Sequence, residues 1–138
     1  MPESAPFLDH FNTAISHATA PAFMLGAVAA FLNVLVNRFE RVVDRFRVLR
    51  AASPATPAKT LAAVSRRLVL LNRGIFFAAL SGLFTAALLI LLFAGALLDI
   101  SHRMGVALLF VLALVLFMVS IVELIRDVRV NLETMHVE

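Results

Sequence analysis

Few side chains in this sequence could carry catalytic or metal chemistry. The chain has no cysteine, which excludes disulfides, thiolate zinc sites and cysteine nucleophiles. His10 and His17 are seven residues apart and share one helical face, but no third metal ligand lies near them in the sequence. The sequence shows no Ser/His/Asp arrangement of recognisable spacing, no paired carboxylates within its apolar stretches and no His-Glu-x-x-His motif. We therefore expect no enzymatic activity, no bound metal and no cofactor.

One acidic residue stands at the end of an apolar stretch. Glu123 directly follows the uncharged residues 104–122 and lies close to the expected depth of Arg38 and Arg73. A structural ion pair among these three residues is one role. Proton handling or ion coordination is the other, because ionisable groups at membrane depth often mark ion and proton paths. We expect the ion pair.

Two amides continue a row of small residues. The row steps by three or four positions, so it occupies one face of a helix. Its members are Ala22, Gly26, Ala30, Asn33, Asn37 and Arg41. An amide in an apolar region needs a partner or water. Either Asn33 bonds a neighbouring helix, through Ser81 or Thr85, or the row lines a wet path between subunits, which makes its six residues candidate pore-lining positions.

The composition is typical of a protein embedded in a lipid membrane. Hydrophobic residues make up 62% of the 138 residues, charged residues make up 15%, and the mean hydropathy is +0.96. A soluble domain has about 45–50% apolar and about 25% charged residues. Three stretches, 18–36, 74–98 and 104–122, are uncharged and near the length of about 20 residues that a spanning helix needs. The sequence predicts an all-α protein with three transmembrane helices.

The segments around these spans are also predicted to be helical. Ser4 and Pro6 begin a short amphipathic helix suited to the membrane surface, and Pro21 restarts the chain as the first spanning helix. Acidic Glu3 and Asp9 stand where a signal peptide would be basic, so we expect the first span to be retained. The expected segments of a single membrane domain, 1–138, are an interfacial helix 5–18, a first helix 20–50, a turn 51–60, a second helix 61–98 with its span 74–98, an outer turn 99–103 and a third helix 104–130.

The first two helices should continue beyond the membrane as a hairpin. Apolar residues of 39–49 recur at spacings of three and four, and those of 61–71 do the same, so two stripes can pack together. Asp44 lies three residues from both Arg41 and Arg47 and can pair with either. Candidate contacts to lipid or a partner are Arg45, Arg47, Arg50, Arg66 and Arg67. No Gly-rich phosphate loop accompanies them, and we expect no nucleic acid partner.

Basic residues predict the orientation. Residues 38–73 contain nine Lys or Arg and two acidic residues, whereas the chain before His17 has no Lys or Arg. Because basic loops stay on the cytoplasmic side, the hairpin should face the cytoplasm. The N-terminus is then outside and the C-terminus is cytoplasmic.

These features resemble a bacterial membrane family known as domain of unknown function 2721. The resemblance rests on Pro21 early in the first span, on the pattern R-x-x-R-V-x-D-R-x-R at 38–47, and on Arg66 and Arg67 with Arg73 before the second span. It covers about residues 13–127 and implies three helices in a bacterial inner membrane. It implies no activity.

Three thin helices cannot enclose a polar path alone, so transport would require several copies in a ring. Our leading functional hypothesis is a homo-oligomeric ion channel or pore with the first helix lining its axis. The alternative is a structural or accessory membrane protein whose basic hairpin docks a partner or anionic lipid.

The orientation leads to a labelling test. Because the chain has no native cysteine, a single cysteine at Ala55 or at Ser4 gives an unambiguous signal. In intact cells, a membrane-impermeant thiol reagent should label the Ser4 variant and not the Ala55 variant. Labelling at Ala55 with protection at Ser4 would show that the orientation is inverted.

Overall fold

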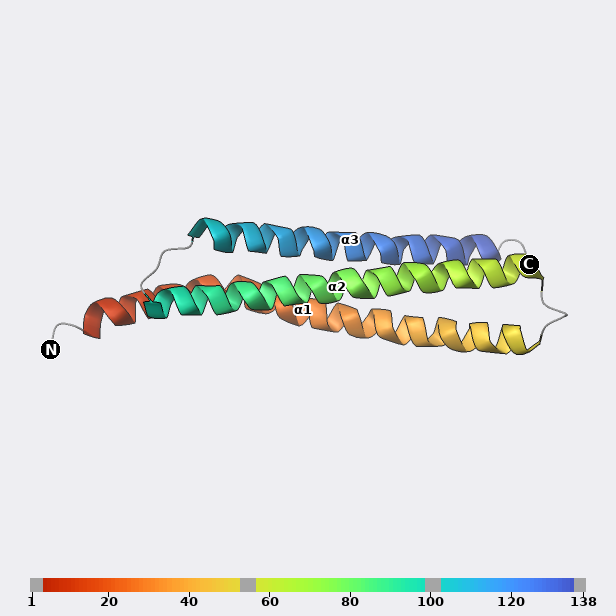
Figure 1. Ribbon diagram of the computed structural model, residues 1–138, viewed down its shortest axis with the longest axis horizontal. Helices are drawn as coiled ribbons and strands as arrows, with labels where there is room; N and C mark the ends of the chain where they lie inside the picture. The colour runs from red at the N-terminus through yellow and green to blue at the C-terminus, as the bar shows by residue number, and fades with distance from the viewer. Residues whose placement is uncertain (1–3, 53–56, 99–102, 136–138) are drawn as a thin grey trace.

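The computed structural model describes residues 4–52, 57–98 and 103–135 as three long helices (Figure 1). They are α1 (Ser4–Ala51), α2 (Ala58–Leu98) and α3 (Arg103–Met135). Within those ranges there is no strand, which confirms the all-α prediction with three long apolar helices. Residues 53–56 and 99–102, which belong to the two expected turns, lie outside the described residues.

Helix α1 differs from the expectation at its start. The segment expected as a separate interfacial helix forms the first turns of α1, and the helix passes through Pro21 without restarting. Proline removes one backbone hydrogen bond, to the carbonyl of His17 four residues earlier. Membrane helices tolerate that loss when neighbouring groups cover the site, and Pro21 is buried.

Backbone hydrogen bonds mark the end of α1 and the start of α2. The N–H of Ala52 donates to the carbonyl of Val48 at 3.1 Å. At the start of α2, the carbonyl of Pro57 accepts from Thr60 at 3.0 Å and from Leu61 at 3.4 Å. Helix α2 therefore begins before Thr60, which lies inside the first turn instead of capping the helix.

Helix α2 is the central helix of the bundle. It runs antiparallel to both α1 and α3 and packs extensively against each, whereas α1 and α3 have few contacts with each other (Figure 1). One direct contact between these outer helices is the edge-to-face pair of Phe31 and Phe117, whose ring centroids are 5.3 Å apart. The two chain termini lie at opposite ends of the bundle, as three antiparallel helices require (Figure 1).

The α1–α2 hairpin has an apolar core with a seven-residue repeat. Buried Val28, Leu35 and Val42 of α1 follow one another every seven residues, and so do Val64, Leu71, Ala78 and Thr85 of α2. Such a repeat keeps one seam of each helix facing its partner. The stripes predicted from the sequence meet in this core, which also includes Phe39, Phe46, Leu49 and Leu68.

The α2–α3 interface is more polar than the α1–α2 core. The Ser120 hydroxyl donates to the Gly74 carbonyl at 2.6 Å, and the Ser81 hydroxyl donates to the Ala113 carbonyl at 2.7 Å. A Cβ atom at Gly74 would lie 3.7 Å from the Cβ of Glu123 and 3.6 Å from Leu35. The small residue thus lets both outer helices approach α2 at one level.

Most of the apolar surface remains outside the bundle. In the most apolar stretch of each helix, only 22%, 22% and 11% of the residues are buried for α1, α2 and α3. Large side chains such as Phe23, Ile90 and Met118 are 68–78% exposed. All three helices are long and apolar enough to cross a membrane, and lipid is the solvent that suits this surface.

The hairpin core can be tested at Phe46, which packs against the buried cluster that includes Val42 and Val64. Phe46→Asp should lower stability by several kcal/mol, because a carboxylate without a partner would enter an apolar core. The matched control is Val48→Asp, since Val48 is 69% exposed and should tolerate the charge. Thermal unfolding in detergent measures both. Equal melting temperatures for the two variants would contradict a packed hairpin.

Candidate functional site

A polar row runs along the C-terminal half of α3 and faces the bundle. Its spacings of three, four and four residues place its members on one helical face. They are Ser120, Glu123, Asp127 and Asn131. Asp127 is 0% exposed and Glu123 is 2% exposed. Two carboxylates so deeply buried require partners, because desolvating a charge is costly unless it is paired and hydrogen-bonded.

Asp127 is the centre of a clamp that joins all three helices. Its Oδ1 accepts a hydrogen bond from Arg67 Nε of α2 at 2.9 Å. Arg67 Nη1 also donates to Asn131 Oδ1 at 2.7 Å, so the guanidinium holds two turns of α3 at once. From α1, Arg38 Nη1 lies 3.6 Å from Asp127 Oδ2. We call these four residues, Arg38, Arg67, Asp127 and Asn131, the three-helix clamp.

Glu123 lies one turn nearer the apolar spans. Its Oε1 is 3.6 Å from Arg73 Nη2 and 3.6 Å from Arg126 Nη1. The expected grouping of Arg38, Arg73 and Glu123 is therefore divided, because Arg73 lies near Glu123 whereas Arg38 lies near Asp127. Within the described chain, Glu123 Oε2 and Asp127 Oδ2 have no hydrogen-bond partner.

The arginines expected to contact lipid or a partner fall into two groups. Arg67 is mostly buried, with only 13% of its side chain exposed, and it belongs to the three-helix clamp. The other four are exposed, namely Arg45, Arg47, Arg50 and Arg66. Arg47 lies 3.8 Å from Asp44 in a pair whose side chains are both about three-quarters exposed. Such surface pairs contribute little to stability.

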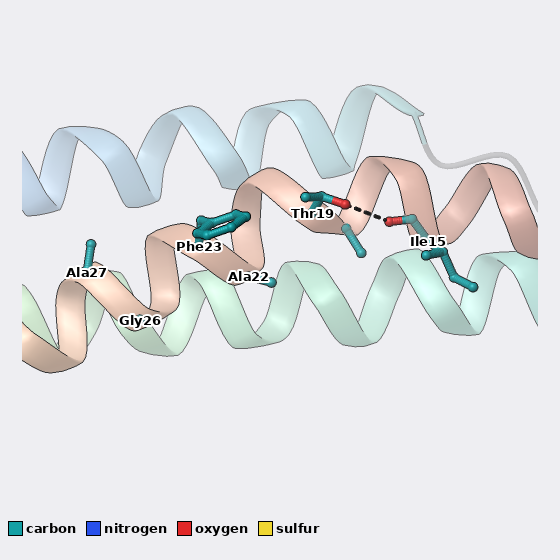
Figure 2. A pocket seen from close by; sticks show the side chains of 7 residues that line it. Ile15, Thr19, Ala22, Phe23, Gly26 and Ala27 are labelled. Atoms are coloured by element: carbon teal, nitrogen blue, oxygen red, sulfur yellow. Dashed lines mark hydrogen bonds between the residues drawn. The ribbon is translucent and has the colours of Figure 1, made fainter.

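The candidate pore-lining residues form an exposed face on α1, which we call the α1 face. All six are exposed, namely Ala22, Gly26, Ala30, Asn33, Asn37 and Arg41. A Cβ atom built at Gly26 would meet nothing within 4 Å. Ala22 and Gly26, together with Thr19 and Phe23, border a shallow concavity of about 770 Å³ on the surface of α1 (Figure 2).

Among the described residues, the amides of the α1 face do not bond another helix. Asn37 Nδ2 donates to Asn33 Oδ1 at 3.4 Å, along α1 itself. The expected partners are engaged elsewhere, since Ser81 donates to Ala113 and Thr85 donates to the Ser81 carbonyl at 2.9 Å. Asn33 lies five residues from Arg38, about 7 Å into the apolar span.

The histidines of α1 do not gain a third ligand. Among the described residues, no group of three His, Asp or Glu side chains could hold a metal ion. His10 and His17 instead line a cavity that is considered below.

Sequence reasoning missed the importance of Asp127, Asn131 and Ser120. A usable signal was present, because these residues and Glu123 repeat at helical spacing on a helix that is otherwise apolar on that side. The contact between Arg67 and Asp127, which are 60 residues apart, needed the register of the helices.

Three apolar helices held together by a buried polar clamp define a multi-pass helical membrane protein. The family described as "Protein of unknown function (DUF2721)" matches residues 18–137, and the chain belongs to this family. No curated protein and no solved structure matches the chain. The resemblance seen in the sequence is thereby confirmed at the level of the family.

The clamp can be tested by removing its cation. Arg67→Met leaves the Asp127 carboxylate buried and should destabilise the bundle by roughly 3–5 kcal/mol, the usual cost of breaking a buried pair. The double variant Arg67→Met/Asp127→Leu removes both charges and should recover much of that loss. Asp44→Asn, which breaks an exposed pair, should cost about 0–1 kcal/mol. Thermal unfolding in detergent measures all three, and equal losses for Arg67→Met and Asp44→Asn would contradict the clamp.

Proposed function

We propose that this membrane protein assembles into a homo-oligomer in which the α1 face of each copy surrounds a shared axis, and that the axis conducts ions. The observation that carries the proposal is the exposure of Asn33 and Asn37 on an otherwise small, apolar face. The helix already has a different, large-residue seam for packing on α2, so the α1 face is free for contacts between copies.

The chemistry of the amides favours a second copy over lipid. Each amide has two donors and an acceptor, and the bond between Asn37 and Asn33 uses only one donor and one acceptor. Acyl chains offer no partner for the remaining groups, whereas an amide from another copy, or water on an axis between copies, does. The small residues Ala22 and Gly26 permit close helix approach toward the other end of the face.

The basic hairpin supports the proposed orientation. Arg41, Arg45 and Arg50 are exposed on α1 at the end away from the N-terminus. With this end in the cytoplasm, the N-terminus is outside, the C-terminus is cytoplasmic, and the membrane is the bacterial inner membrane. The proposed role is non-enzymatic.

An accessory role is the second candidate. The exposed arginines of the hairpin, including Arg47 and Arg66, form a basic surface outside the spans. Such a surface attracts anionic lipid headgroups or an acidic partner protein. In this reading, the α1 face is only a packing seam between copies or with the partner.

Two substitutions on the α1 face distinguish a conducting axis from a packing seam. If the face lines an axis, Gly26→Leu should block ion flux while the oligomer survives, and Asn33→Ala should change flux without unfolding. If the face is a seam, Gly26→Leu should dissociate the oligomer, and Asn33→Ala should weaken helix association by about 0.6–2 kcal/mol. Oligomer mass in detergent and ion flux from proteoliposomes are measured together.

The matched control is Gly105→Leu on α3, where an added Cβ atom also meets nothing within 4 Å. This variant should change neither flux nor mass. Wild-type proteoliposomes that show no flux above empty ones, for any common cation or anion across pH and voltage, would exclude the channel. A monomer would exclude both forms of self-assembly.

A further inference from the structure

A cavity of about 620 Å³ lies between the three helices, toward the N-terminal end of α1. It lies between the first turns of α1, the last turns of α2 and the start of α3. Its volume falls within the range of about 300–1,000 Å³ that is typical of small-ligand sites. The three-helix clamp lies farther along the bundle, toward the hairpin. No residue of the α1 face lines the cavity.

The cavity exists because the facing residues are small. Ala14 and Ala20 of α1, Gly95 and Ala96 of α2 and Ala107 of α3 all line it. Toward the other end of the bundle the corresponding gaps are filled by Leu, Val and Phe side chains. At the level of the cavity, Phe11 of α1 contacts Phe93 of α2, with ring centroids 6.3 Å apart, so these two helices remain in contact there.

The walls and the rim of the cavity have different chemistry. Leu88, Leu92 and Phe110 give it apolar walls. His10, His17 and Arg103 supply nitrogen donors, and among its described lining residues there is no Asp or Glu. Arg103 is also the first residue of α3, where the free backbone N–H groups of a helix N-terminus add to the attraction for an anion.

We propose that this cavity binds an anionic phospholipid. One acyl chain lies along the leucines and Phe110, and the phosphate is held by Arg103 with the His17 imidazole as a further donor. A histidine donates at least one N–H whether it is neutral or protonated, so the site does not require a particular protonation state. A lipid suits the cavity better than a free phosphate does, because an inorganic anion would leave the apolar walls without a partner.

This proposal is independent of conduction. A lipid at the N-terminal end would fill the space between α1 and α3, the two helices that have few contacts of their own. Binding to the folded bundle raises its melting temperature, and the rise grows with the logarithm of lipid concentration once this exceeds the dissociation constant.

The test uses the full chain in a neutral detergent. Phosphatidylglycerol is titrated and compared with phosphatidylcholine of identical acyl chains and with inorganic phosphate. Native mass spectrometry measures bound lipid, and thermal unfolding measures stabilisation. We expect phosphatidylglycerol to be retained and to raise the melting temperature, phosphatidylcholine to do so more weakly, and inorganic phosphate to have no effect.

Variants then locate the binding. Arg103→Gln should weaken retention of phosphatidylglycerol about tenfold or more, the loss expected for a hydrogen bond to a charged group. Ala107→Phe, at an exposed position that lines the cavity, should weaken retention of both lipids by filling the space. Gly105→Leu, whose site does not line the cavity, and Arg45→Gln, on the distant hairpin, are the controls and should retain phosphatidylglycerol as the wild type does.

Four results would overturn the proposal. Equal retention of phosphatidylglycerol and phosphatidylcholine would show that the site does not recognise the anionic headgroup. If Arg45→Gln lowered retention of phosphatidylglycerol as much as Arg103→Gln does, the lipid would bind at the hairpin and not in the cavity. Unchanged retention in Ala107→Phe would exclude the cavity. Stabilisation by inorganic phosphate equal to that by phosphatidylglycerol would show that the ligand is a free anion and not a lipid.

Discussion

The hydrogen-bonded ion pair between Arg67 and Asp127 fixes how the bundle is assembled. Apolar helices in lipid have no hydrophobic drive to associate, and smooth leucine-rich surfaces can slide past each other. A buried carboxylate prevents such sliding of the helices, because a shift of one turn would separate it from its cation. The polar contacts of α2 and α3 share this register, since Arg67, Gly74 and Ser81 meet residues of α3 that are also seven positions apart.

That register makes α2 a helix with two seams. One seam, at 64, 71, 78 and 85, packs on α1 and is apolar except for Thr85, and the other, at 67, 74 and 81, packs on α3 with polar and small residues. A repeat of seven residues is shorter than two full turns of a straight helix and is typical of left-handed packing. Because both partners use α2, α1 and α3 touch each other in few places, notably at Phe31 with Phe117 and through Arg38.

Two consequences of this arrangement bear on function. In the described part of the chain, the face of α1 opposite its seam is exposed, although it carries two amides at membrane depth. Small side chains also face one another between the three helices toward the N-terminal end of α1, where a cavity is lined by apolar residues and by basic groups. The three-helix clamp is structural in character, because Arg38 and Arg67 pair with the buried Asp127 and hold the three helices at the level where the spans meet the hairpin.

The sequence by itself determined the class, the number of helices, the hairpin and the family, because spans and amphipathic stripes are local patterns that hydropathy and periodicity record directly. It also identified the α1 face as one helical surface, since a spacing of three and four fixes that without any partner. Only the tertiary structure decided that Arg67 turns inward to Asp127, that Arg38 and Arg73 serve different carboxylates, and that Asn33 has no partner on α2. These outcomes depend on the rotation and register of helices whose contacting residues are tens of positions apart, and the free energy that selects them arises only when the buried charges meet.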